Sequence, residues 1–250
     1  MRLEIVERFL KGESIRKIAQ SIGLSHTGLS YQLRKLGLDT RPKRYAIQIP
    51  TVDLNNEEFC YWLGFLLADG NVTKTGKVQL GLQKRDIDHI KKFRTFLKSD
   101  HPIFIDKGSP RIIIANKQLC ELFAQFGIVP CKSLITLVDD RLANNKHFWR
   151  GMVDGDGSVS WAKKRYKKYF RVRLCGTLHV CQKWQSFLIA NDIDASSNAI
   201  QSMKSIYELD IQGVKALRAA DLIYADTSVY LDRKYQTYLT ADGCSSHNIS

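Results

Sequence analysis

Two aspartates end two apolar segments of similar sequence, and they are the residues of this chain best placed to do chemistry. Asp69 lies near the end of Phe59–Val72, and Asp156 lies near the end of Phe148–Val159. Five pairs of identical residues share a spacing of 87 positions: Trp62 and Trp149, Gly64 and Gly151, Asp69 and Asp156, Gly70 and Gly157, and Val72 and Val159. Two copies of one supersecondary unit predict a pseudo-twofold molecule.

Each segment is apolar on nearly all sides before an abrupt Asp-Gly, which is typical of a buried helix. A single copy would be read as an ordinary core helix that stops at glycine. Small residues one turn apart, Gly64 with Ala68 and Gly151 with Gly155, would let two such helices approach closely. The two aspartates would then lie side by side at negative helix ends, where they need a shared proton or cation. Oxygen ligands alone favour Mg²⁺.

The duplication continues beyond the two segments. Three further pairs share a spacing of 91: Phe93 and Trp184, Phe96 and Phe187, and Leu97 and Leu188. We place the four additional residues of the second copy in a longer hairpin between the two sets of pairs.

The two segments resemble the LAGLIDADG motif of homing endonucleases, and their paired occurrence resembles the single-chain, two-motif members. The resemblance spans roughly residues 57–240. It implies an α+β fold with two αββαββα halves, each offering a curved sheet to DNA. The eighth motif position, Asp69 and Asp156 here, binds the metal in that family. The sixth position is Leu67 in one copy and Asp154 in the other. Because the metal-binding acid is at the eighth position, the resemblance does not require Asp154 as a metal ligand.

Two lysines extend the resemblance. Gly127-Ile-Val-Pro-Cys-Lys132 and Tyr230-Leu-Asp-Arg-Lys234 resemble the segments that end the two halves in that family. The resemblance implies that Lys132 and Lys234 lie near the active site and act in catalysis, where a cation could offset developing phosphate charge. The alternative is a surface lysine that ends an element.

Two segments have the alternating pattern of strands with one polar face. Residues 77–83 place Lys77, Gln79 and Gln83 opposite apolar residues, and residues 168–174 place Arg171 and Arg173 likewise. These types suit base edges in a major groove, although a solvated sheet face would show the same alternation.

A basic arm surrounds the second strand. Residues 160–173 carry seven cations and no acid, with aromatic residues interleaved: Lys163, Lys164, Arg165, Lys167, Lys168, Arg171 and Arg173. A run of like charge is usually a solvated or interaction surface. Beside the expected site it predicts phosphate contacts and salt-sensitive binding.

The first 38 residues show the pattern of three short helices, over residues 2–11, 15–22 and from residue 26 onward. Ser14 and Ser25 are suitable N-caps of the second and third helices. The pattern predicts a helix-turn-helix whose DNA-binding face consists of His26, Thr27, Ser30, Tyr31, Arg34 and Lys35. The alternative is a small helical cap with a solvated face, and such three-helix units can also bind protein.

The predicted domains are the helix-turn-helix 1–38, a basic linker 39–56, the repeats 57–146 and 147–242, and a tail 243–250. The linker's Arg41, Lys43 and Arg44 are expected to follow a phosphate backbone. The chain of 250 residues has a net charge of +13, of which residues 1–50 hold +6 and residues 160–173 hold +7. No segment has the pattern of a signal peptide or membrane span, so we expect a cytoplasmic protein in a bacterial, phage or organellar interior.

These features together predict a monomeric, site-specific endonuclease that cleaves both strands of double-stranded DNA at a long pseudo-palindromic target. The expected cofactor is Mg²⁺ or Mn²⁺, and the resemblance implies homing of a mobile intron. Two alternatives remain open: a non-catalytic DNA-binding regulator of the same fold, and a maturase that binds intron RNA through the basic arm.

Overall fold

A duplicated α+β unit forms most of the chain. The computed structural model describes residues 3–40, 45–132 and 135–245, and it divides into two compact units, Met1–Tyr45 and Ala46–Ser250. The elements of the larger unit's first half are α4 (Glu57–Ala68), β1 (Asn71–Thr73), β2 (Lys77–Gly81), α5 (Ile87–Phe96), β3 (Ile103–Asp106), β4 (Ser109–Ala115) and α6 (Lys117–Ala124). Those of the second half are α7 (Lys146–Asp156), β5 (Gly157–Lys164), β6 (Lys167–Gly176), α8 (Leu178–Ala190), β7 (Ile200–Met203), β8 (Ile206–Gln212) and α9 (Val214–Tyr224), followed by α10 (Asp232–Ser245).

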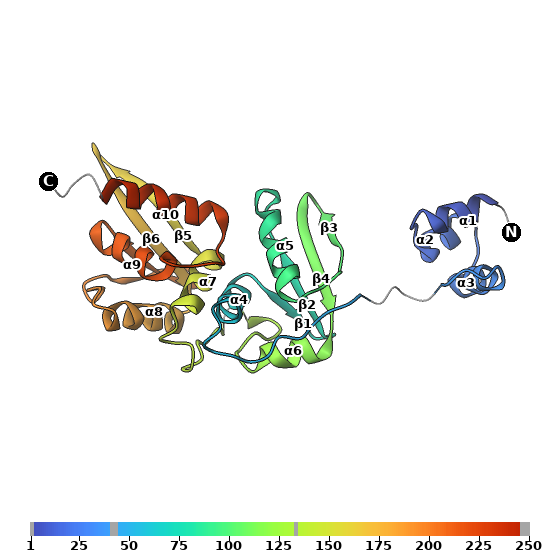
Figure 1. The fold of residues 1–250 in the computed structure, drawn as a ribbon, viewed down its shortest axis with the longest axis horizontal. Helices are drawn as coiled ribbons and strands as arrows, with labels where there is room; N and C mark the ends of the chain where they lie inside the picture. The colour runs from blue at the N-terminus through green and yellow to red at the C-terminus, as the bar shows by residue number, and fades with distance from the viewer. Residues whose placement is uncertain (1–2, 41–44, 133–134, 246–250) are drawn as a thin grey trace. The chain divides into compact units, whose positions relative to one another are not determined.

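The two halves have the same topology, which confirms the predicted pseudo-twofold αββαββα duplication. Each half contains an antiparallel four-stranded sheet, with strand order β1-β2-β4-β3 in one and β5-β6-β8-β7 in the other. Figure 1 shows α4 and α7 side by side between the two sheets, with the remaining helices of each half against its own sheet. The single large core of this unit includes residues of both halves.

Equivalent aromatic contacts join the first helix of each half to its second. Trp62 packs against Phe93 with ring centroids 5.0 Å apart, and Trp149 packs against Trp184 at 5.2 Å. These are the pairs whose spacing indicated the repeat.

The second half has a longer hairpin than the sequence suggested. Val72 pairs with Val78, six positions on, whereas the equivalent Val159 pairs with Val172, thirteen positions on. The hairpin is therefore seven residues longer, not four. A three-residue 3₁₀ helix, Lys84–Asp86, precedes α5 in the first half and restores the spacing of 91. Sequence spacing reports only the sum of two opposite changes in length, so it could not separate them.

The close approach of α4 and α7 depends on two glycines. A Cβ atom on Gly64 would overlap the carbonyl oxygen of Phe148, and one on Gly151 would overlap that of Tyr61 and lie 2.7 Å from the amide nitrogen of Phe65. Any larger residue at either position would push the two helices apart. This contact fixes the ends of α4 and α7 relative to each other.

The smaller unit contains α1 (Leu3–Leu10), α2 (Ile15–Ser21) and α3 (His26–Lys35). The hydroxyl oxygens of Ser14 and Ser25 accept hydrogen bonds from the backbone N–H groups of Lys17 and Gly28, which confirms both predicted N-caps. A separate small core of fully buried residues, Ile18, Leu29 and Leu33 among them, holds the three helices together.

Candidate active site and nucleic-acid interface

Asp69 and Asp156 lie at the C-terminal ends of the two packed helices. Asp69 is the C-cap of α4 and Asp156 is the last residue of α7. Gly155 brings the helix ends together, since a Cβ atom there would overlap that of Ala68 and lie 3.5 Å from the amide nitrogen of Asp69. The two aspartates, 87 positions apart in sequence, thus share one edge of the helix pair.

The two carboxylates repel each other. Burial raises the pKa of Asp156 to about 6, and the negative charge of Asp69 adds to that rise. Burial also raises the pKa of Asp69, while the cations Lys234, Lys132 and Arg233 act to lower it. Both side chains nevertheless remain exposed to solvent. Two reachable acids that destabilise each other's charged form are suited to binding a cation.

Lys132 and Lys234 lie near the aspartates, and each contacts the C-terminal end of one motif helix. The Lys132 ammonium donates to the carbonyl oxygen of Ala68 at 3.0 Å. The Lys234 ammonium donates to three carbonyl oxygens of α7 and its end, those of Val153, Asp154 and Gly157, at 2.6–2.7 Å. Both side chains are buried, which lowers both pKa values, that of Lys234 to about 8. Lys132 and Lys234 thus lie near enough to Asp69 and Asp156 for their charges to interact, and their role in catalysis stays a prediction.

The aspartates open onto two different cavities. The Lys132 pocket, of about 180 Å³, is lined by Asp156 with Lys132, Thr136, Cys175 and Thr177 among its polar residues. The Arg233 pocket, of about 370 Å³, is lined by Asp69 with Gln83, Asp86, Ser109, Arg111 and Arg233. Asp69 and Asp156 therefore each face a separate space large enough for a phosphate group.

The donor set suits a divalent cation of the magnesium type. Among the described residues, no group of three or more His, Cys, Asp or Glu side chains could hold a metal ion. Two carboxylates fit Mg²⁺, because that ion keeps several waters and commonly uses one or two carboxylates together with substrate phosphates. The two acids stand at the joined ends of α4 and α7, and a cation between them would offset both the burial and the charge of Asp69 that raise the Asp156 pKa.

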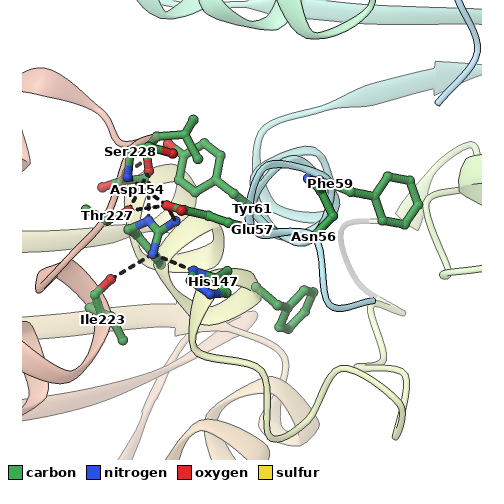
Figure 2. A network of polar contacts seen from close by, with 12 residues as sticks. Asn56, Glu57, Phe59, Tyr61, His147, Asp154, Ile223, Thr227 and Ser228 are labelled. Carbon is green, nitrogen blue, oxygen red and sulfur yellow. Dashed lines mark hydrogen bonds and ion pairs between the residues drawn. The ribbon is translucent and has the colours of Figure 1, made fainter. Parts of the chain in front are cut away.

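A buried polar network behind the site was not anticipated from the sequence (Figure 2). Asp154 accepts a hydrogen bond from the hydroxyl of Tyr61 at 2.8 Å. It also accepts hydrogen bonds from the hydroxyl of Tyr224 at 2.5 Å and from the backbone N–H of Leu231 at 2.7 Å. The last of these bonds ties Asp154 to the start of α10, the helix that carries Lys234. The available sequence signal was an acid within an otherwise apolar motif. Leu67 at the equivalent position of the first copy gave no reason to assign that acid a role.

The predicted polar faces of the two sheets are present, although they differ in charge. Val78, Leu80, Phe170, Val172 and Leu174 are buried, as the alternation predicted. On the other face, Arg171 forms bonds of 2.7 and 2.6 Å with Asp210, and Arg173 lies 3.0 Å from Glu208. The arginines are thus paired with acids of β8 that the sequence had not connected to them. In the first half, Lys77 and Gln79 lie on the corresponding face of β2, which ends before Gln83.

The basic arm projects beyond its sheet as a two-stranded ribbon. Lys163 lies opposite Lys168 and Lys164 opposite Lys167, while β8 pairs with β6 only from Arg171 onward. All four lysines and Arg165 are exposed, and Tyr166 at the tip is 96% exposed. Like charges directly opposite each other on a ribbon are destabilising, and a polyanion bound there would relieve that repulsion.

The smaller unit presents most of its expected polar face. His26, Thr27, Tyr31, Arg34 and Lys35 are exposed on α3. Ser30 differs, because it is buried and its hydroxyl donates to that of Thr40 at 3.0 Å. The linker residues Arg41, Lys43 and Arg44 lie outside the described residues.

Comparison with solved structures identifies the fold of this chain. Structures of the I-SmaMI K262A mutant and of the I-LtrWI LAGLIDADG homing endonuclease bound to target DNA superpose with TM-scores of 0.54 and 0.51. This chain has the LAGLIDADG homing endonuclease fold. The matches cover 77% and 76% of the chain and 92% of each neighbour, at 10% and 11% sequence identity. I-SmaMI bound to cleaved DNA is also similar, with a TM-score of 0.52 and 10% identity over 81% of this chain and 94% of its own.

The likeness to these structures is one of fold, at sequence identities of 10–11%. No model of a known protein family matches the sequence, and no curated protein matches it. None of the described helices combines the length and hydropathy needed to cross a membrane.

Proposed function

We propose that this protein is a site-specific DNA endonuclease that hydrolyses a phosphodiester bond in each strand of its target. The observation that carries the proposal is the pair of solvent-reachable, mutually repelling carboxylates of Asp69 and Asp156. They stand at the joined ends of two helices within the LAGLIDADG fold. I-LtrWI and I-SmaMI, which share the fold, have been solved with target DNA and with cleaved DNA respectively.

Asp69 and Asp156 would hold the divalent cation, Mg²⁺ or Mn²⁺, which supplies charge neutralisation and a more acidic water when bound. I-SmaMI, which has a similar fold, has been solved bound to an uncleaved DNA target in the presence of calcium ions. Lys132 and Lys234 provide fixed positive charge under the same edge. Lys234 acts through its field rather than by contact, because its three N–H groups already donate to backbone carbonyls.

DNA recognition falls to surfaces outside the reacting centre. Lys77, Gln79, Arg171 and Arg173 on the sheets would read base edges, while the arm would contact phosphates. The smaller unit, as a helix-turn-helix, and the basic linker would lengthen the contact. Because one chain contains both halves, we propose a monomer acting on a long pseudo-palindromic duplex, in the interior of a bacterial cell, phage-infected cell or organelle, with intron homing as its role.

The experiment begins with selection of bound duplexes from a randomised pool in Ca²⁺, which avoids any need to know the target. The selected sequence is cloned into a supercoiled plasmid and incubated in Mg²⁺ with the full chain. We expect linear product from the wild type and a loss of at least about 10²-fold in rate for Asp69→Asn and Asp156→Asn. The matched control is Asp192→Asn, an exposed carboxylate outside the site. Undiminished cleavage by either motif variant would contradict the proposal.

One observation favours a second partner. The arm exposes Tyr166 almost fully among lysines, an arrangement that can stack on an unpaired base. Intron RNA is therefore the second candidate ligand, and a maturase the second candidate function. Competition between the selected duplex and structured RNA for the wild-type protein separates the two. Tight duplex binding without cleavage in Mg²⁺ or Mn²⁺ would instead indicate a regulator.

A further inference from the structure

The two cavities beside the aspartates differ in the cation that they offer. The Arg233 pocket contains two guanidinium groups, those of Arg111 and Arg233, whereas the Lys132 pocket contains the single ammonium of Lys132. Arg233 was not among the residues that the resemblance assigned. Its charge reaches the carboxylate of Asp69 across the cavity, where it acts to lower the Asp69 pKa.

Asp86 holds Arg233 by one edge and leaves the other edge available. The Nε atom of Arg233 lies 3.2 Å from each carboxylate oxygen of Asp86, which is itself buried. No described residue accepts a hydrogen bond from the Nη1 or Nη2 atom, and the arginine side chain is 40% exposed. A guanidinium held in this way presents two parallel donors, the geometry that matches two phosphate oxygens.

The backbone under Arg233 is fixed on both sides. Leu231 donates its N–H to the buried Asp154 carboxylate, and Lys234 is anchored by three hydrogen bonds. Arg233 lies between these anchors in the first turn of α10. Little freedom therefore has to be lost when its terminal groups bind an anion.

The Lys132 pocket has no equivalent of this arrangement among the residues that the structure describes. Cys131 precedes Lys132 as Arg233 precedes Lys234, so a thiol replaces the guanidinium. Thr177 occupies the position of Asp86 at the repeat spacing of 91, and its hydroxyl donates to the Thr136 carbonyl. Strand register places the acid Glu208 where the first half has Arg111. Arg111 lines the Arg233 pocket, whereas Glu208 does not line the Lys132 pocket, so the second cation of the Arg233 pocket has no counterpart among the described residues there.

The geometry points to Arg233 as a further catalytic residue, oriented by Asp86, that binds the scissile phosphate on the Asp69 side. This inference rests on the proposed endonuclease function. In hydrolysis, water oxygen bonds to phosphorus, the bond from phosphorus to the leaving sugar oxygen breaks, and a proton from water ends on that oxygen. Arg233 is unchanged, and its two terminal amino groups donate to the non-bridging oxygens as negative charge develops on them.

The consequence is unequal cleavage of the two strands. The phosphate in the Arg233 pocket meets two guanidinium groups, so its strand is cut first, and the strand in the Lys132 pocket is cut second. A nicked duplex is therefore an intermediate of the wild-type reaction.

The test uses the duplex selected in Ca²⁺, labelled on one strand at a time, under single-turnover conditions in Mg²⁺. We expect Arg233→Gln to slow the first-cut strand about 10²-fold while the other strand keeps its wild-type rate. Arg233→Lys restores only part of that loss because it lacks the two-pronged geometry, and Asp86→Asn produces a smaller loss on the same strand. Arg218→Gln on α9, an exposed arginine outside the site, is the matched control.

Affinity for the duplex in Ca²⁺ and the thermal unfolding midpoint show whether each variant is folded. If Arg233→Gln folds and slows both strands equally, or neither, the assignment of Arg233 is wrong while the endonuclease function stands. If the wild type cuts no selected duplex in Mg²⁺ or Mn²⁺, the endonuclease function itself fails, and the role of Arg233 fails with it. Should Arg233→Gln not fold, Arg233→Lys and Asp86→Asn decide by the same strand comparison.

Discussion

Arg150 of α7 donates a hydrogen bond of 2.7 Å from Nη2 to Oε1 of Glu57 on α4, although its guanidinium is fully buried. The same guanidinium donates to the carbonyl oxygens of Val229 and Ile223 at 2.8 and 3.0 Å. It also lies over the ring of Tyr61. A single buried cation thus joins the two halves behind the aspartates, in the network of Figure 2.

Replacement of Arg150 by Met should lower the free energy of unfolding by about 3–5 kcal/mol. The substitution leaves the buried carbonyl oxygens of Val229 and Ile223 without this donor, and among the described residues Glu57 keeps Thr227 and Ser228 as hydrogen-bond partners. Urea unfolding of the full chain measures the change, with the exposed Arg218→Met on α9 as control. A loss below about 1 kcal/mol would show that the pair contributes little.

Replacement of Gly151 by Ala should destabilise the larger unit by about 1–3 kcal/mol and reduce cleavage more than binding. The added methyl group meets backbone atoms of Tyr61 and Phe65, which cannot move aside as a side chain can. Thermal unfolding and plasmid cleavage are the measurements. Gly28→Ala in α3 meets only the Ser25 hydroxyl, so it serves as control and should leave the larger unit's midpoint unchanged.

The stability of the protein should rise between about pH 8 and pH 10.5 through Lys234. Burial lowers the folded pKa of this lysine to about 8 from the 10.5 of an exposed lysine. In that window the unfolded chain binds a proton that the folded chain has released, so the free energy of unfolding increases with pH. We expect a contribution of about 1–3 kcal/mol. The measurement compares the pH dependence of urea unfolding for the wild type and Lys234→Gln in EDTA; parallel curves would contradict it.

Replacement of both Lys163 and Lys168 by Ala should weaken binding to the selected duplex and reduce its salt dependence. These lysines face each other on the arm, and each phosphate contact contributes about 0.9 to the slope of log K against log salt. We therefore expect a slope smaller by about 1–2, measured by fluorescence anisotropy in Ca²⁺. Lys183→Ala with Lys215→Ala, on α8 and α9, is the matched control, and an equal effect from both pairs would exclude a specific role of the arm.

Much of the fold could be predicted from the sequence because its determinants are local or periodic. The repeat, the buried motif helices and the alternation of β2 and β6 follow from the spacing of apolar residues, and the caps at Ser14 and Ser25 from short-range hydrogen bonding. The two aspartates could be paired because they end homologous helices whose small residues allow contact. Each of these inferences needs only neighbouring residues or one repeat distance.

The tertiary structure decided everything that depends on partners far apart in the chain. Asp154 meets Tyr61 and Tyr224 across 93 and 70 positions, and Asp86 meets Arg233 across 147. The pairing of Arg171 with Asp210 likewise needed the register of β6 against β8. Sequence periodicity states which side of an element is buried, but long-range electrostatic and hydrogen-bond partners depend on how elements pack. The sequence thus predicted the pair Asp69 and Asp156. Only the packing of distant segments showed that Arg111 and Arg233 line the pocket beside Asp69 and that Lys132 lines the pocket beside Asp156.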